Sequence, residues 1–158
     1  MKKSSTCYIK SLKIIAMGAH FFNKHAQEGN IFLSDLAKEL GEPDNLQKAE
    51  RILKVVMHTL RDRITLEESF QFTAQLPLFL KEVYVSEWKY RKSPVKIKHI
   101  NEFIETAKMK ALGTVSQDFA HDESAVLAVK SVFKVLGRYV SAGICFRRGM
   151  AGYIRQFA

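Results

Sequence analysis

The chain has 158 residues and a net charge of +9 at pH 7, and 47% of its residues are hydrophobic and 26% charged. A chain of this length can bury a core large enough to fold without a disulfide or metal staple. Its apolar content excludes a disordered protein. The composition favours helices over sheets, because the chain has only three prolines and abundant Ala, Leu, Glu and Lys.

The positive charge is distributed unevenly. Residues 30–88 carry seven basic and ten acidic side chains, whereas residues 89–100 carry five basic side chains and no acidic one. A polyanion would therefore meet the segment 89–100 or the C-terminal half of the chain.

The N-terminus and the cysteines indicate the compartment. Lys10 and Lys13 interrupt the apolar stretch that a signal peptide would need, and no segment reaches the roughly 18 to 20 apolar residues of a membrane span. Cys7 and Cys145 lie at opposite ends of the chain, a spacing that favours reduced thiols over a disulfide framework. The sequence predicts a cytoplasmic protein without membrane contact.

Two helices are expected in the first 40 residues. The first covers residues 9–26 and ends at Gly29 and Asn30, and a short second helix covers residues 32–40 and ends at Gly41 and Pro43. The apolar stripe of the first helix recurs at three- and four-residue steps and comprises Ile9, Leu12, Ile15, Ala16, Ala19 and Phe22.

Residues 49–64 have the clearest helical period in the chain. One narrow arc is apolar and predicts the side that faces the core, and it contains Ala49, Leu53, Val56, Met57, Leu60 and Ile64. The opposite side is polar and is formed by Arg51, Lys54, His58 and Asp62.

Turn signals divide the following residues. Thr65 and Glu68 have the spacing of a capping box, which predicts a new helix there. Pro77 fits the first turn of a further helix that runs towards Trp88, so the chain is expected to break around Gln75 and Leu76. Residues 89–100 then predict an extended, basic connector, after which Asn101 is expected to cap a helix that ends near residue 112.

The two halves of the chain resemble each other. Asn30–Gly41 resembles Asn101–Gly113, and at a constant offset of 76 the apolar positions of residues 49–64 recur. The paired positions are Ala49 and Ala125, Leu53 and Val129, Val56 and Val132, Met57 and Phe133, Leu60 and Leu136, Ile64 and Val140, Thr65 and Ser141, and Phe70 and Phe146. The polar side is not repeated, because His58 corresponds to Lys134 and Asp62 to Arg138.

The duplication predicts an all-α fold in which two tandem degenerate helical repeats pack as one compact bundle, with an extra N-terminal helix. The expected segments are the N-terminal helix at 1–29, the first repeat at 30–88, the connector at 89–100 and the second repeat at 101–158.

A family resemblance covers most of the chain. Its most specific parts are the run Leu60-Arg61-Asp62-Arg63, the turn Gln75-Leu76-Pro77, and the later Tyr84 and Trp88. In these features the chain resembles the bacterial domain of unknown function 2267. The resemblance implies an all-helical fold of two related halves, and it implies no activity. The second half departs from it, because Gly152 and Tyr153 stand where the first repeat has Leu-Pro.

Arg61, Asp62 and Arg63 have two interpretations. Two guanidinium groups near a helix C-terminus can bind phosphate or carboxylate. The favoured interpretation is structural, since arginines there complement the helix dipole and pair with acids of neighbouring helices.

The connector is the best functional candidate. It combines phosphate-binding charge with aromatic rings that can stack on bases. Its candidate residues are Trp88, Lys89, Tyr90, Arg91, Lys92, Lys96 and Lys98. The simpler alternative is a solvated basic loop, with Trp88 and Tyr84 sealing the edge of the core.

Other site classes find weak support. The histidines at 20, 25, 58, 99 and 121 lack the spacing of paired metal ligands, and Cys145 has no nucleophile signature. A helix-turn-helix cadence follows residue 32, but the acidic residues 35, 39, 42, 44 and 50 oppose DNA contact there. A small apolar ligand between the repeats would need a pocket at Met57, Phe133 and Phe146, where the pattern predicts filled core.

The sequence therefore predicts a non-enzymatic protein-interaction or regulatory module, without metal or cofactor, whose partner is a protein and can be a second copy. The alternative function is weak, nonspecific nucleic-acid binding through the connector and the C-terminal half.

Overall fold

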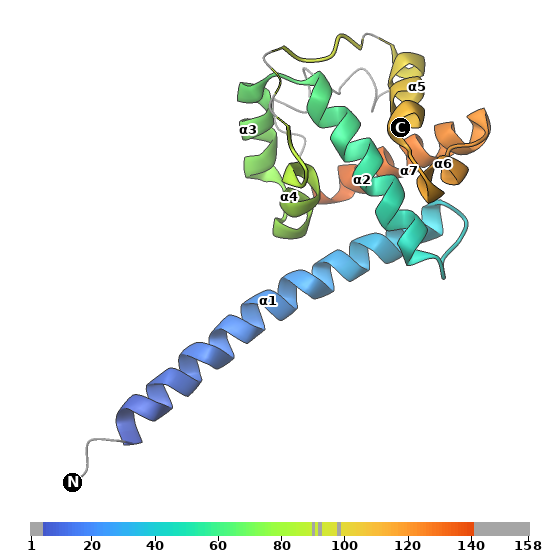
Figure 1. The fold of residues 1–158 in the computed structure, drawn as a ribbon. Coiled ribbons are helices and arrows are strands. Elements are labelled where there is room, and N and C mark those ends of the chain that lie inside the picture. Colours follow the sequence, from blue (N-terminus) through green and yellow to red (C-terminus); the bar gives the residue numbers. More distant parts are fainter. Residues whose placement is uncertain (1–4, 90, 92, 98, 141–158) are drawn as a thin grey trace.

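The structure is a computed structural model that describes residues 5–89, 91, 93–97 and 99–140, with the backbone alone for residues 5–19 and for Thr114. This part of the chain is all-helical and contains no strand. The helices are α1 (Ser5–Glu39), α2 (Leu46–Arg63), α3 (Leu66–Gln75), α4 (Leu78–Val85), α5 (Ile100–Lys110), α6 (Thr114–Asp118) and α7 (Asp122–Tyr139). They form a compact body from which α1 projects (Figure 1). The predicted all-α fold class and compact helical bundle are confirmed.

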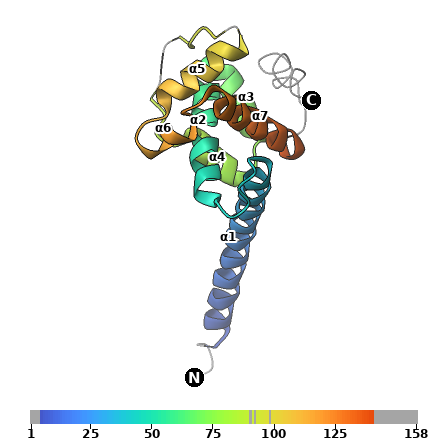
Figure 2. The same cartoon turned by 90° about the vertical axis from the view of Figure 1, so that its right-hand side faces the viewer.

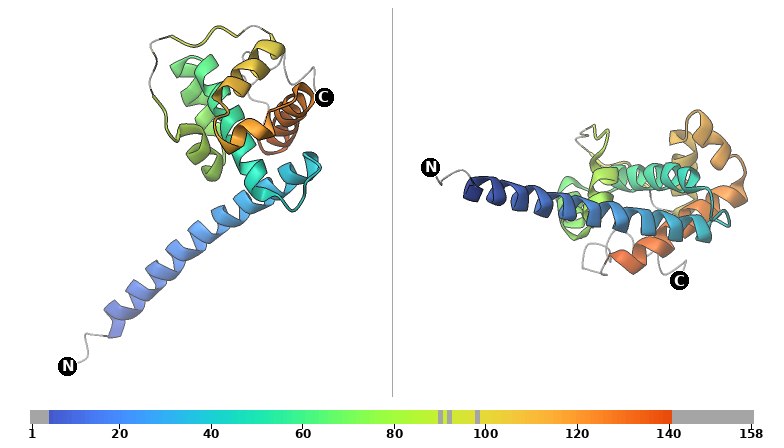
Figure 3. Two further views of the ribbon diagram at one scale, coloured as in Figure 1. Left: turned by 45° about the vertical axis from the view of Figure 1, so that its right-hand side comes forward. Right: turned by 90° about the horizontal axis from the view of Figure 1, so that it is seen from below.

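Helix α1 is continuous, so the predicted helix end at Gly29 and Asn30 is wrong. Glycine weakens a helix by only about 1 kcal/mol relative to alanine. Packing offsets that cost here, because a Cβ atom at Gly29 would lie 3.5 Å from Cβ of Phe79. At that distance a methyl group would make only ordinary contact, so α1 and α4 pack directly against each other at this position. The C-terminal part of α1 lies against the body, while the N-terminal part extends well beyond it (Figures 2 and 3).

Helix α2 is the centre of the body and contacts α1, α4, α5, α6 and α7. The predicted core positions from Ala49 to Leu60 are buried. The polar side of α2 is partly covered as well, because neighbouring elements contact the helix from several directions. Its charged residues therefore meet partners: Arg51 binds Asp118, Lys54 binds Glu87 and Asp62 binds Lys110.

The local signals around α3 and α4 are confirmed. The Thr65 hydroxyl accepts a hydrogen bond from the Glu68 amide at 3.2 Å, and the Glu68 carboxylate accepts one from the Thr65 amide at 3.0 Å. Helix α4 follows Pro77 and ends at Val85, earlier than the expected run to Trp88. The positive φ of 55° at Glu87 turns the chain away from the helix.

Residues 88–99 contain no helix in their described part, as expected of a connector. The predicted cap of the next helix is wrong by two residues. Helix α5 begins at Ile100 with His99 as its N-cap, so Asn101 lies inside the first turn. The extended backbone of His99 sets the boundary, since an N-cap residue has non-helical dihedral angles.

Helices α2 and α7 agree with the predicted duplication. Each has 18 residues, and each end of α7 lies 76 positions after the corresponding end of α2. The five pairs from Ala49 and Ala125 to Leu60 and Leu136 are all buried. The counterparts of α3 and α4, including Phe146 and the Gly152-Tyr153 departure, lie outside the described residues, so the duplication as a whole stays a prediction.

The end of α1 joins the two halves. The Glu39 carboxylate pairs with Lys134 and Arg138 of α7, and Tyr139 donates to Asp35 at 3.2 Å. The hydrogen bond from Lys134 and the charges of both partners lower the pKa of Glu39. None of the described helices has both the length and the apolar character needed to cross a membrane.

Candidate functional site

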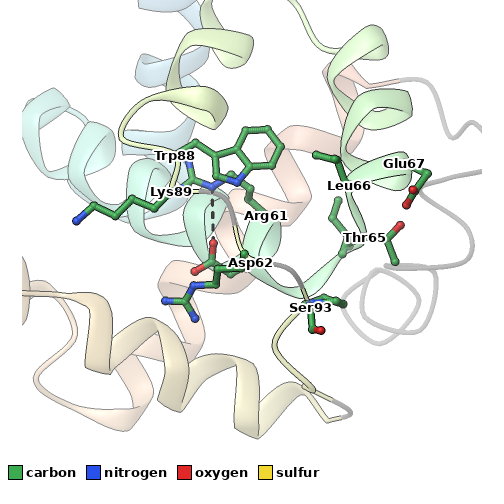
Figure 4. Close-up of a pocket in the computed structure, with 11 residues that line it drawn as sticks. Arg61, Asp62, Thr65, Leu66, Glu67, Trp88, Lys89 and Ser93 are labelled. Carbon is green, nitrogen blue, oxygen red and sulfur yellow. Dashed lines mark ion pairs between the residues drawn. The ribbon is translucent and has the colours of Figure 1, made fainter.

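A pocket of about 230 Å³ lies where α2, the start of α3 and the connector meet. Arg61 and Asp62 line it from α2, residues 64–67 line it from the α2–α3 junction, and Trp88, Lys89, Arg91, Ser93 and Pro94 line it from the connector. Figure 4 shows the Trp88 ring beside Arg61, with the Asp62 carboxylate below them. The pocket thus unites part of the predicted arginine cluster with part of the predicted connector surface.

Arg61 caps helix α4 from the neighbouring helix. Its Nη1 donates to the carbonyl oxygens of Tyr84 at 2.7 Å and Ser86 at 2.9 Å. The last carbonyl groups of a helix lack partners within it, and α4 has no basic residue in its last turn. Arg61 is 6% exposed, and this burial lowers the pKa of its guanidinium group, against the influence of Asp62. The favoured structural interpretation of Arg61 agrees with these contacts.

His58 completes this cap one turn earlier on α2. Its Nε2 lies 3.0 Å from the carbonyl oxygen of Val83 and 3.2 Å from the Ser86 hydroxyl. Burial lowers the pKa of His58, and the charge of Arg61 lowers it further. The neutral ring with a proton on Nε2 therefore suits this position, since it can donate to the carbonyl oxygen.

An aromatic group covers the buried guanidinium. The Arg61 Cζ atom lies 5.4 Å from the centroid of the Trp88 ring, and the Tyr84 and Trp88 rings meet edge to face at 5.8 Å. The Tyr84 hydroxyl donates to Ser69 at 2.8 Å, and burial raises the pKa of Tyr84 to about 12. Trp88 thus contributes one face to the edge of the core while it also lines the pocket.

The three charged residues of the predicted cluster serve different neighbours. Asp62 binds Nζ of Lys110 at 2.6 Å and lies 3.7 Å from Nε of Arg61. Burial lowers the pKa of Lys110, and the hydrogen bond to Asp62 opposes that change. Nε of Arg63 donates to the carbonyl oxygen of Ile97 at 2.9 Å. Arg63 thus holds the connector and does not line the pocket, so the three residues of the cluster do not share one pocket.

The predicted connector surface is only partly brought together. Lys89 and Arg91 are exposed and line the pocket, whereas Lys96 is exposed and lies outside the set of lining residues. The Val95 amide donates to the Asp62 carbonyl oxygen at 2.7 Å and anchors the connector to α2. Tyr90, Lys92 and Lys98 lie outside the described residues.

The remaining predicted positions lie apart from the pocket. Leu76 of the turn Gln75-Leu76-Pro77 is buried, while Gln75 is exposed and bonds the Gln71 carbonyl oxygen. Met57 and Phe133 are buried in the core. Within the described part of the chain, no three His, Cys, Asp or Glu side chains gather as metal ligands.

Sequence reasoning missed the start of α3 as part of the site. The capping box located this helix end, but nothing in the local pattern indicated that the connector would return to it from residue 88.

Comparison with known proteins gives one family. The model of a family described as "Uncharacterized conserved protein (DUF2267)" matches residues 29–146. No curated protein matches the chain.

Proposed function

This chain belongs to the DUF2267 family of uncharacterized conserved proteins, and because that description assigns no activity, we propose its function from the structure. We propose that it is a non-enzymatic interaction module in the cytoplasm that pairs with a second copy of itself through the projecting part of α1.

The exposed aromatic residues of α1 carry this proposal. Phe21 is 52% exposed and Phe22 is 67% exposed, and their rings meet each other at 5.5 Å. Both precede Gly29, where α1 packs against Phe79 of α4, and α1 as a whole projects from the body at its N-terminal end (Figure 3). Two large apolar side chains side by side on a projecting helix are typical of an interaction surface.

The spacing of residues along α1 favours another helix as the partner. Apolar or small residues recur along α1 at steps of four and three residues in turn, which is the period of a coiled coil. The row consists of Tyr8, Leu12, Ile15, Ala19, Phe22, Ala26, Gly29, Leu33 and Leu36. At its C-terminal end Gly29 meets Phe79 and Leu36 is fully buried. One helix row therefore begins outside the body and ends inside it.

The positions of the lysines support a second copy as that partner. Lys10, Lys13 and Lys24 fall between the row positions in the heptad places farthest from a coiled-coil seam. Two copies of α1 can therefore pair without bringing these like charges together. A second copy also carries the same apolar row by definition, which satisfies the self-complementarity of a twofold interface.

Sedimentation equilibrium of the full chain tests the proposal. The protein concentration is raised to about 100 µM, which is high enough to detect micromolar dissociation constants. We expect the wild type to form a dimer in this range and Phe22→Glu to remain a monomer. Lys24→Glu, a charge change two residues away and off the row, should leave the dimer intact. A wild type that stays monomeric, or equal weakening by both substitutions, would contradict the proposal.

Weak nucleic-acid binding is a second candidate because Lys89, Arg91 and Lys96 are all exposed on the connector. It would be nonspecific, since positive charge attracts the phosphate backbone of any sequence and salt weakens that attraction. Fluorescence anisotropy with an oligonucleotide at about 50 mM salt should then show binding that salt abolishes. Lys96→Glu should weaken it, and an unchanged affinity would count against this function.

A further inference from the structure

We infer that the pocket between α2, α3 and the connector binds a small phosphate-bearing molecule. The inference does not depend on dimer formation through α1. It rests on the charges that line the pocket, on the helix end that opens into it and on an unused donor of a buried arginine.

Positive charge prevails in the lining. Arg61, Lys89 and Arg91 contribute three cations. Asp62 also lines the pocket, but its carboxylate is already paired with Lys110 at 2.6 Å. Glu67 is the remaining acid, and it is exposed at the pocket edge, where Figure 4 places it away from Trp88 and Arg61. An anion that binds beside Arg61 can therefore leave the shorter Asp62–Lys110 pair in place, although it competes with the looser Arg61–Asp62 contact of 3.7 Å.

The first turn of α3 provides uncharged donors. Thr65, Leu66 and Glu67 line the pocket at the N-terminus of this ten-residue helix. The capping box occupies the amides of Thr65 and Glu68, so the amides of Leu66 and Glu67 remain without helical partners. Amides at a helix N-terminus, together with the helix dipole, favour oxyanions such as phosphate.

The buried Nε atom of Arg61 is a hydrogen-bond donor without an acceptor in the described part of the chain, and this observation is independent of the charges and of the helix end. The residue is 6% exposed, yet its Nε atom has no hydrogen-bond partner among the residues that the structure describes. The nearest charged group is the Asp62 carboxylate at 3.7 Å, which is too long for a hydrogen bond. Buried donors are rarely left unpaired. A ligand oxygen reached by a small shift of the side chain would pair this donor.

The size of the pocket limits the ligand. Pockets for drug-sized molecules usually span about 300–1,000 Å³, and this pocket has about 230 Å³. It suits a phosphate monoester with a body of a few carbon atoms. The apolar part of such a molecule would lie against Trp88, Ile64 and Pro94, which also line the pocket.

Trp88 provides the readout because it is the single tryptophan of the chain. The full chain is titrated with glycerol 3-phosphate at constant ionic strength while tryptophan fluorescence and thermal unfolding are followed. We expect a saturable fluorescence change and a rise in the unfolding temperature, since a ligand that binds the native state stabilises it. Glycerol should produce neither change, and glycerate tests whether a carboxylate can replace the phosphate.

Three exposed residues give matched variants that spare the buried Arg61. Arg91→Glu should weaken binding about tenfold or more, the loss expected for a charge-assisted hydrogen bond. Lys96→Glu changes the charge by the same amount on the same connector but outside the pocket, and it should change the affinity by less than about twofold. Glu67→Gln should tighten binding, because it removes the acid at the pocket edge.

Two results would overturn the inference. One is the absence of both the fluorescence change and the stabilisation with glycerol 3-phosphate. The other is equal weakening by Arg91→Glu and Lys96→Glu, which would indicate a diffuse basic surface in place of a pocket. Neither result bears on the dimer test with Phe22→Glu, so the two proposals fail separately.

Discussion

Replacing Arg61 with methionine tests whether an arginine of α2 stabilises the protein by capping α4. Methionine keeps an apolar stem but removes the donor, so the carbonyl oxygens of Tyr84 and Ser86, at 2.7 and 2.9 Å, lose their partner. An unsatisfied buried acceptor costs about 1–3 kcal/mol. The Tyr84 bond is buried and the Ser86 bond partly so, which predicts a combined loss of about 3 kcal/mol in the free energy of unfolding.

Urea and thermal unfolding, followed by circular dichroism at the helical band, measure this loss. In a chain of this size about 3 kcal/mol corresponds to a fall of about 6–12 °C in Tm. Arg138→Met is the control, because Arg138 pairs with Glu39 at the surface and exposed pairs contribute at most about 1 kcal/mol. Equal stability of Arg61→Met and the wild type, or equal losses in the two variants, would refute the capping argument.

Three further predictions concern stability. Burial lowers the pKa of His58, so the unfolded chain takes up its proton first. The free energy of unfolding should therefore fall as the pH drops below about 6.5, and His58→Gln should reduce this slope in urea titrations at several pH values; an identical slope would contradict the assignment. Thr65→Ala removes one half of the α3 capping box and should cost about 1 kcal/mol, whereas no change in the urea midpoint would show that the cap is dispensable. Gly29→Leu should destabilise the chain by about 1–3 kcal/mol because its side chain would meet Phe79, while Gly29→Ala, whose Cβ reaches only ordinary contact distance, should be tolerated in the same assay.

The sequence predicted those parts of the fold that depend on neighbouring residues. The capping box at Thr65 and Glu68 needs only a side chain three positions away, and the helix break before Pro77 needs only the proline ring. The buried positions Leu53 and Met57 follow from the helical period. These features are confirmed because their cause lies within a few residues of the chain.

The continuity of α1 could not be predicted in this way. Gly29 and Asn30 form a local signal for a helix end, and the packing of Gly29 against Phe79 overrides it. The contact joins residues 50 positions apart, so it depends on how α4 folds back against α1. Local propensity is a weak prior where such packing decides.

The candidate site was predicted in pieces. Charge identified Lys89 and Arg91, and the resemblance drew attention to Arg61. A helical pattern assigns one side of α2 to solvent, however, and cannot show that α4 and the connector cover that side. The burial of Arg61, its bond to Tyr84 and the junction with the start of α3 all follow from that covering.

The continuity of α1 has a consequence for how its projecting part forms. Starting a helix is the unfavourable step, and adding residues to an existing helical turn is nearly neutral. The buried turns around Phe32 and Leu36 provide that start, so the projecting part grows from a nucleus held by the core. In the monomer it should unwind from its N-terminal end residue by residue. Amide hydrogen exchange along α1 is then expected to slow progressively from Phe21 towards Leu36, as a gradient and not as a single cooperative step.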